Sequence, residues 1–192
     1  MKRVIIIALI ALIVPACLFA GRGLVDLTIG ATASTTYTIK DIQDGKLADF
    51  KFENLTFGAD AELKMAFVAI DTRAIYVPET KSVYGMVSAN LAVDIIIARL
   101  KAGLGYRYNY NIDKDILTYG VNGVSKVDGF KDAYFDINVG LDFLLGNLTI
   151  GAYATLPTST SIKNGDWSGL YTKISDHWSN ALLGITVGID LI

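Results

Sequence analysis

The most constraining feature of this chain is residues 98–110, where apolar side chains alternate with polar or small ones without an exception. One set reads Ala98, Leu100, Ala102, Leu104, Tyr106, Tyr108 and Tyr110, and the other reads Arg99, Lys101, Gly103, Gly105, Arg107 and Asn109. Successive side chains of a β-strand point to opposite faces, so the pattern predicts one long two-faced strand. Strands usually have about five or six residues, and this one is long enough for its apolar face to lie in lipid.

The same alternation recurs along the chain and predicts eight strands in total. We expect them at residues 24–37, 52–65, 67–77, 82–93, 98–110, 133–145, 148–156 and 181–192. Tight turns are expected around Ala66, around Asp94 and at Gly146-Asn147, whereas residues 38–51, 111–132 and 157–180 form long loops. All long loops then lie at one end, as in transmembrane barrels with short periplasmic turns. The sequence therefore predicts an all-β fold, an eight-stranded antiparallel up-and-down transmembrane β-barrel.

The N-terminus has the features of a secretory signal peptide. Lys2 and Arg3 precede an apolar run over residues 4–20 that only Pro15 interrupts. A basic start, an apolar centre and small residues near the end are typical of such a peptide. We expect residues 1–20 to be removed and residues 21–192 to form one outer-membrane barrel domain, with cleavage after Ala16 as an alternative.

Cys17 is the only cysteine in the chain. It follows Val14-Pro15-Ala16, a loose lipoprotein box, so lipidation of Cys17 is a second interpretation of this segment. If Cys17 leaves with the signal peptide, the mature chain can form no disulfide.

Composition and charge exclude some partners. The formal net charge is −2, and removal of Lys2 and Arg3 leaves 15 basic against 19 acidic side chains, or −4, which argues against nucleic acid. The mean hydropathy is +0.42, yet after the N-terminal segment no stretch approaches 18 uninterrupted apolar residues. The apolar excess is therefore spread over alternating strands, where hydropathy averages out.

The polar faces carry glycines and charges of both signs, which suit a crowded interior of paired groups. Arg99 and Lys101 are expected to face inward, near Asp136 or Asp142. The residues predicted to line the lumen, and any solute path through it, are Asp60, Glu62, Lys64, Asp71, Arg73, Arg99, Lys101, Arg107, Asp136 and Asp142. A soluble lipocalin-like carrier, with its apolar face inward, is the alternative for the same alternation.

With its signal peptide, strand count, loop asymmetry and amphipathic last strand, the chain resembles the small outer-membrane barrels of the OmpA, OmpX and OmpW kind. The resemblance rests on this architecture over residues 24–192 and not on a motif. Such barrels commonly end in an aromatic residue, whereas this chain ends in Leu191-Ile192. The resemblance implies a location in a bacterial outer membrane.

Catalytic and metal-binding chemistry is not expected. His177, the sole histidine, lies in a predicted loop as Ser175-Asp176-His177, and sequence proximity alone does not give the convergent geometry that catalysis needs. Asp113 and Asp115 lack the glycine turn and terminal glutamate of a calcium loop. We therefore expect no enzyme activity, no cofactor and no metal.

The function expected first is display of the long loops at the cell exterior, in a structural, adhesive or binding role. The alternative, which the OmpW resemblance implies, is a restricted, porin-like channel or transporter for small solutes, including hydrophobic ones. Expected partners are outer-membrane lipid and an external ligand or host surface, and the chain is expected to be a monomer.

Overall fold

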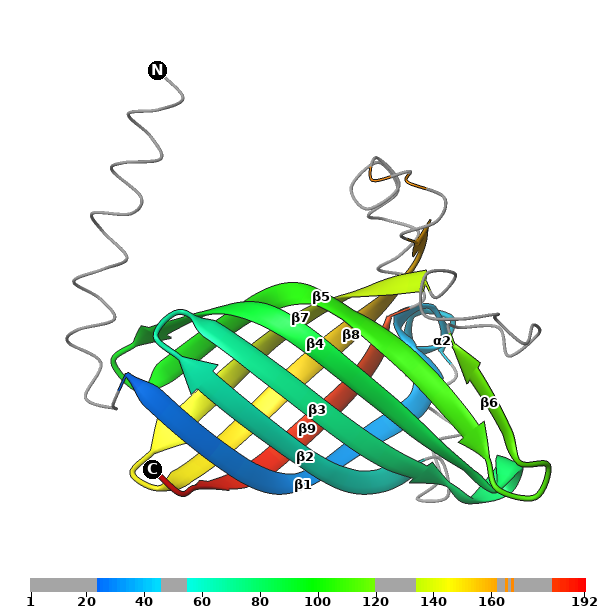
Figure 1. Ribbon diagram of the computed structural model, residues 1–192, viewed down its shortest axis with the longest axis horizontal. Helices are drawn as coiled ribbons and strands as arrows, with labels where there is room; N and C mark the ends of the chain where they lie inside the picture. Colours follow the sequence, from blue (N-terminus) through cyan, green and yellow to red (C-terminus); the bar gives the residue numbers. More distant parts are fainter. Residues whose placement is uncertain (1–23, 46–54, 120–133, 162–164, 166, 168–180) are drawn as a thin grey trace.

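The computed structural model describes residues 24–45, 55–119, 134–161, 165, 167 and 181–192 (Figure 1). The expected signal peptide with Cys17, and the loop segment with His177, lie outside the described residues.

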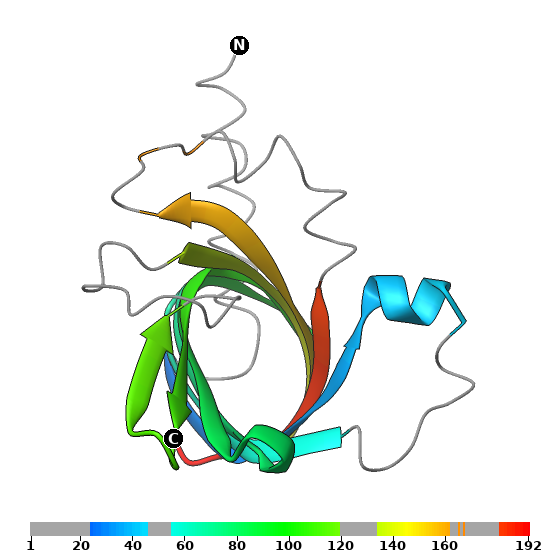
Figure 2. The same cartoon turned by 90° about the vertical axis from the view of Figure 1, so that its right-hand side faces the viewer.

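Eight long strands form a closed antiparallel barrel. They are β1 (Val25–Thr38), β2 (Leu55–Met65), β3 (Val68–Val77), β4 (Ser82–Ile95), β5 (Ala98–Asn111), β7 (Tyr134–Leu145), β8 (Leu148–Ser161) and β9 (Leu182–Asp190). Each pairs with the next in this order, and β9 pairs with β1 to complete the ring (Figure 2). Closure satisfies the backbone groups that an open sheet leaves at its edges. The predicted eight-stranded up-and-down barrel is confirmed.

The strands turn their polar faces inward. On β5, Arg99 is fully buried while its neighbour Leu100 is 48% exposed, as the alternation of this segment predicts. The same division runs around the wall. Large apolar side chains exposed on the outer face include Ile29, Phe57, Ile70, Val87, Leu91, Leu100, Leu141, Phe143, Ile150, Ile185, Val187 and Ile189.

The two ends of the barrel differ, as the loop lengths predict. One end, the turn end, carries the two-residue turns 66–67, 96–97 and 146–147, and the chain finishes there (Figure 1). The first residue of each turn has a positive φ: 54° at Ala66, 56° at Ile96 and 65° at Gly146. A two-residue hairpin favours this conformation because it matches the strand twist. Only glycine adopts a positive φ without steric cost, so the β-branched Ile96 adopts this conformation at a cost.

The turn expected around Asp94 is misplaced by two residues. β4 continues to Ile95, and Asp94 lies within it, 2% exposed, opposite Arg99 of β5. The reason is that an isolated aspartate between apolar residues is typical of a turn, whereas Asp94 belongs to the inward face of the strand.

The opposite end, the loop end, carries more regular structure than predicted. Helix α2 (Ile39–Gln43) starts within the expected first loop, η3 (Pro78–Thr80) lies between β3 and β4, and strand β6 (Ile116–Tyr119) pairs with the last four residues of β5. Strand β8 runs to Ser161, five residues past its predicted end. β5 pairs with β7 only as far as Tyr106.

Helix α2 is held against the outside of the barrel. Thr38 and Asp41 form a capping box, in which the Thr38 N–H donates to Asp41 Oδ2 at 3.0 Å and the Asp41 N–H to Thr38 Oγ1 at 3.3 Å. Ile39 donates its N–H to the Ala181 carbonyl at 3.2 Å and packs on a small apolar cluster with Leu156. No helix among the described residues is long and apolar enough to cross a membrane.

Candidate functional site

The interior of the barrel is polar, and it is the candidate functional site. Among the described residues, 25 polar or charged side chains are buried and only 10 apolar ones. All ten charged residues predicted for the lumen are buried there. Asp26 and Asp94 join them, so the buried set holds seven carboxylates (Asp26, Asp60, Glu62, Asp71, Asp94, Asp136 and Asp142) and five cations (Lys64, Arg73, Arg99, Lys101 and Arg107).

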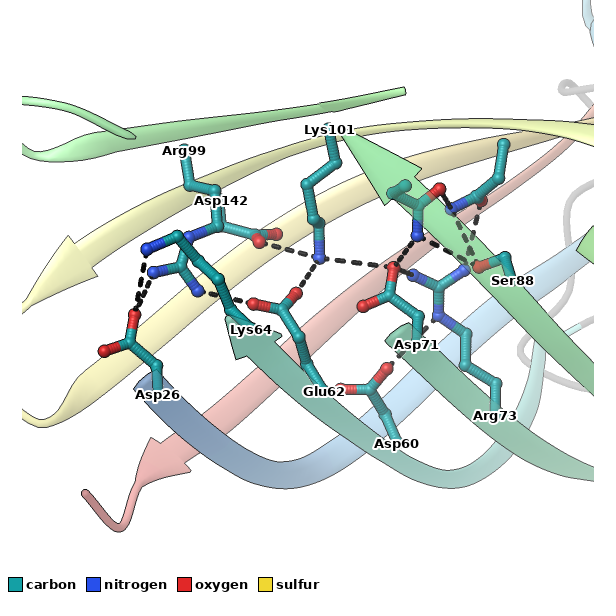
Figure 3. A network of polar contacts seen from close by, with 12 residues as sticks. Asp26, Asp60, Glu62, Lys64, Asp71, Arg73, Ser88, Arg99, Lys101 and Asp142 are labelled. Atoms are coloured by element: carbon teal, nitrogen blue, oxygen red, sulfur yellow. Dashed lines mark hydrogen bonds and ion pairs between the residues drawn. The ribbon is translucent and has the colours of Figure 1, made fainter. Parts of the chain in front are cut away.

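Arg99 of β5 is the centre of the network near the turn end. Its guanidinium binds Asp94 of β4 through two hydrogen bonds, Nε to Oδ1 at 2.6 Å and Nη2 to Oδ2 at 2.9 Å. It also donates to Glu62 of β2 and to Asp26 of β1 (Figure 3). Lys64 lies beside the same group, with Nζ 3.0 Å from Asp94 Oδ2. Arg99 thus links β5 to three other strands, β1, β2 and β4.

Lys101, two residues further along β5, holds a second group of carboxylates. Its Nζ is 2.8 Å from Asp142 Oδ2 of β7 and contacts Glu62, while Asp71 Oδ2 of β3 is 3.6 Å away (Figure 3). Glu62 therefore bridges Lys101 and Arg99 with its two oxygens.

These contacts differ in part from the expected partners. The expectation that Lys101 lies near Asp142 agrees with the structure. Arg99 lies opposite Asp142 in the strand register, but the hydrogen bonds of Arg99 go to Asp94, Glu62 and Asp26 instead. Asp136 lies farther toward the loop end, where it accepts from Arg107. Arg99 thus takes one partner, Asp94, from the neighbouring strand β4, and its long side chain also reaches across the lumen to Glu62 and Asp26, so the pairing with β7 does not set its partners.

Arg73 of β3 occupies the middle of the lumen. It donates to Asp60 Oδ2 at 3.2 Å and to Asn138 Oδ1 at 3.3 Å, and its guanidinium lies 3.8 Å from the centre of the Tyr153 ring. Uncharged groups extend this layer. Asn90 donates to Asp71 Oδ2 at 2.8 Å, and Asn138 donates to Asn90 Oδ1 at 3.1 Å.

Toward the loop end, the described residues of the lumen include a separate ion pair and a small cavity. Arg107 Nε donates to Asp136 Oδ2 at 2.7 Å, and the guanidinium lies 5.2 Å from the Tyr84 ring centre. The cavity between Tyr84 and Arg73 measures about 20 Å³, which is room for about one water molecule. Its walls include Ile75 and Met86.

Glycines allow the wall to come close to this packed interior. A Cβ on Gly103 would lie 2.0 Å from the Ala89 carbonyl oxygen, and one on Gly58 would lie 2.0 Å from the Ala74 carbonyl oxygen. Neither backbone oxygen can move away without disturbing the ladder. These contacts show that the backbones of neighbouring strands approach closely at these glycines, in a wall as narrow as eight strands impose.

Five members of the network are not among the predicted site residues: Asp26, Ser88, Asn90, Asp94 and Asn138. Asp26, Ser88, Asn90 and Asn138 lie on the polar faces of predicted strands, so their inward direction follows from the alternation, whereas the sequence predicts a turn at Asp94. In the part of the chain that the structure describes, no group of three or more histidine, cysteine or acidic residues has the arrangement of a metal site.

Comparison with known proteins gives no relative. No family model matches the chain, and neither a curated protein nor a solved structure is significantly similar to it. The interpretation of the lumen therefore depends on its own geometry.

Proposed function

We propose that this chain is a bacterial outer-membrane barrel, of the OmpA, OmpX and OmpW kind, that acts as a membrane anchor and displays its loop end to the exterior. The observation that carries the proposal is the inverted distribution of polarity, with ion pairs inside and a continuous apolar surface outside. Apolar residues such as Leu91 (63% exposed) and Ile189 (58% exposed) are costly in water and suit lipid contact. A soluble lipocalin-like carrier needs the opposite arrangement, because its ligand cavity lies inside the barrel.

The contents of the lumen favour display over transport. An aqueous path would have to pass Arg99, Lys101 and Arg73, which span the interior and are each bonded to groups on several strands. One cavity along this path, lined by Arg73, Tyr84 and Tyr153, measures about 20 Å³. Passage of a small solute, the second candidate function, would require several buried ion pairs to separate at once.

The loop end offers a surface for an external partner. Ile112, Ile116 and Leu117 of the β5–β6 hairpin are 39–49% exposed and lie beyond the barrel wall. The hairpin is tied to the η3 turn by the Lys81–Asp113 ion pair at 3.0 Å and by Asn111, which donates to the Thr80 carbonyl at 3.0 Å. Exposed apolar groups on a held hairpin are typical of an interaction surface.

Cysteine labelling of intact cells tests the display role. Lys114→Cys places a thiol in the β5–β6 turn, and Asn147→Cys places one in the opposite turn; both positions are exposed. A membrane-impermeant maleimide is expected to label the first in intact cells and the second only after lysis. Labelling of both in intact cells, or of neither before lysis, would contradict the proposed orientation.

Conductance separates display from transport. The purified protein in planar bilayers is expected to show no sustained single-channel current, because the ion network closes the lumen. A steady current that changes when Arg73 is substituted by alanine would favour the restricted channel instead.

A further inference from the structure

The buried network contains more acid than base. Seven carboxylates face five cations among the described residues of the lumen, so full ionisation would leave a net charge of −2 in an interior closed to water. An uncompensated buried charge costs several kcal/mol and is usually avoided by taking up a proton. Among the described residues, the imbalance therefore favours the binding of protons or other cations to some of these carboxylates.

Asp71 is the least compensated of the seven. It is fully buried, and its closest cations, Arg73 Nη2 and Lys101 Nζ, lie 3.5 Å and 3.6 Å from Oδ2. It accepts a hydrogen bond from the neutral Asn90, and its other oxygen, Oδ1, is buried without a hydrogen-bond partner among the described residues. By contrast, Asp94 accepts two hydrogen bonds from Arg99 and lies 3.0 Å from Lys64 Nζ.

The neighbours of Asp71 compete for the same cations. On β2, Glu62 is its register partner, and Glu62 takes the closest contact with Lys101. The titratable or charged groups around Asp71 are Asp60 and Glu62 on β2, Arg73 on β3, Lys101 on β5 and Asp142 on β7, with the uncharged Ser88 and Asn90 on β4 and Asn138 on β7. Lys101 thus serves three carboxylates with one charge.

We propose that Asp71 is a proton-binding site of the closed lumen, and that loss of this proton loosens the ion network. The inference rests on the proposed function only in that the barrel wall shuts the lumen from water. The proton comes from solvent when the barrel folds and returns to it on unfolding, because an unfolded aspartate is ionised at neutral pH. The folded chain then binds more protons than the unfolded chain, so stability falls as the pH rises through the range in which Asp71 ionises.

Infrared spectroscopy of the protein, expressed in full with ¹³C-carboxyl aspartate and extracted in detergent, tests the site directly. A protonated, labelled carboxyl group gives a carbonyl band distinct from that of a carboxylate. We expect the band at neutral pH and a lower intensity of the band in Asp71→Glu, which keeps a carboxyl group but removes the label from this position. Absence of the band in the unsubstituted protein, or an unchanged intensity in Asp71→Glu, would overturn the proposal.

Asp71→Asn and Asp94→Asn form a matched pair for the stability consequence. Both replace a buried aspartate of the same network by its neutral isostere. Asp71→Asn should match the urea midpoint of the parent at about pH 4, and it should remove the decline that the parent shows as the pH rises from there through the range in which Asp71 ionises. Asp94→Asn should lower the midpoint at every pH, because Arg99 loses its bidentate partner. Equal losses in both variants would refute the assignment.

The infrared and urea experiments test the proton site independently of the cysteine-labelling test of display. The infrared band depends on the lumen and not on which end of the barrel faces the exterior. A protein that fails the cysteine-labelling test but shows a weaker band in Asp71→Glu would keep the proton site and reject the proposed function.

Discussion

Arg99→Ala is the substitution that most directly tests whether the lumen holds the barrel together. Arg99 is fully buried and contacts three carboxylates, Asp26, Glu62 and Asp94, on three different strands. Removal of one member of a buried ion pair costs about 3–5 kcal/mol, because the remaining charge stays desolvated. Lys64 and Lys101 remain beside the same carboxylates, so we expect the cost near the lower end, about 3 kcal/mol.

The assay is reversible urea unfolding of the purified protein in lipid vesicles, with the free energy of unfolding from linear extrapolation. Two variants provide the controls. Lys81→Ala removes an ion pair whose members are 62% and 58% exposed, so we expect a loss below about 1 kcal/mol. The double variant Arg99→Met with Asp94→Leu removes both members of the bidentate pair, and we expect a smaller loss than for Arg99→Ala, since such replacements are often nearly neutral.

The reasoning fails if Arg99→Ala costs no more than Lys81→Ala. Such a result would mean that water reaches the lumen freely. An open polar lumen would then be the better description, and the transport alternative would gain support.

Three further outcomes follow from the wall and the N-terminus. Leu104→Arg, on the apolar outer face midway along β5, should cost about 2–4 kcal/mol in vesicles, whereas Leu117→Arg on the β5–β6 hairpin should be tolerated; equal effects in the same urea titration would contradict the lipid-facing assignment. Gly103→Ala should cost about 1–3 kcal/mol because the new Cβ meets the Ala89 carbonyl, while Gly140→Ala, whose nearest neighbour is the Lys101 side chain at 3.1 Å, should cost less; thermal unfolding ranks the two. The intact mass of membrane-extracted protein should correspond to a chain that starts near Gly21 without Cys17, and a mass that retains residues 1–20 or carries acyl chains would rule this out.

The sequence predicted the barrel well because the alternation of apolar and polar residues follows directly from the alternation of outward and inward side chains along each strand. Arg99 and Leu100 differ by one position and lie on opposite sides of the wall, so a shift of one residue would have reversed every face. The same pattern could not give the ends of the strands. Residues 116–119 are β-branched, apolar or aromatic and follow a polar turn, but four residues carry too little periodicity to separate a strand from a loop.

The ion pairs between lumen side chains were harder to predict than the residues that line the lumen. Adjacent strands in an up-and-down barrel place Lys101 near Asp142, and that pair could be expected from the sequence. The contact between Arg99 and Asp26 joins strands that are far apart in the chain, and it depends on the barrel diameter and on side-chain length. An aspartate between apolar residues is also typical of turns, so the sequence alone predicts a turn at Asp94.

Detergent removal is the most direct measurement of the central claim that the apolar face lies outward in lipid. The full chain would be expressed, extracted in detergent and dialysed with or without phospholipid. With lipid, the protein should sediment with the vesicles and migrate differently on gels before and after boiling, as a closed barrel that unfolds only on heating. Without lipid it should precipitate. A protein that remains a soluble monomer after the detergent is removed, and whose mobility does not depend on heating, would contradict the account.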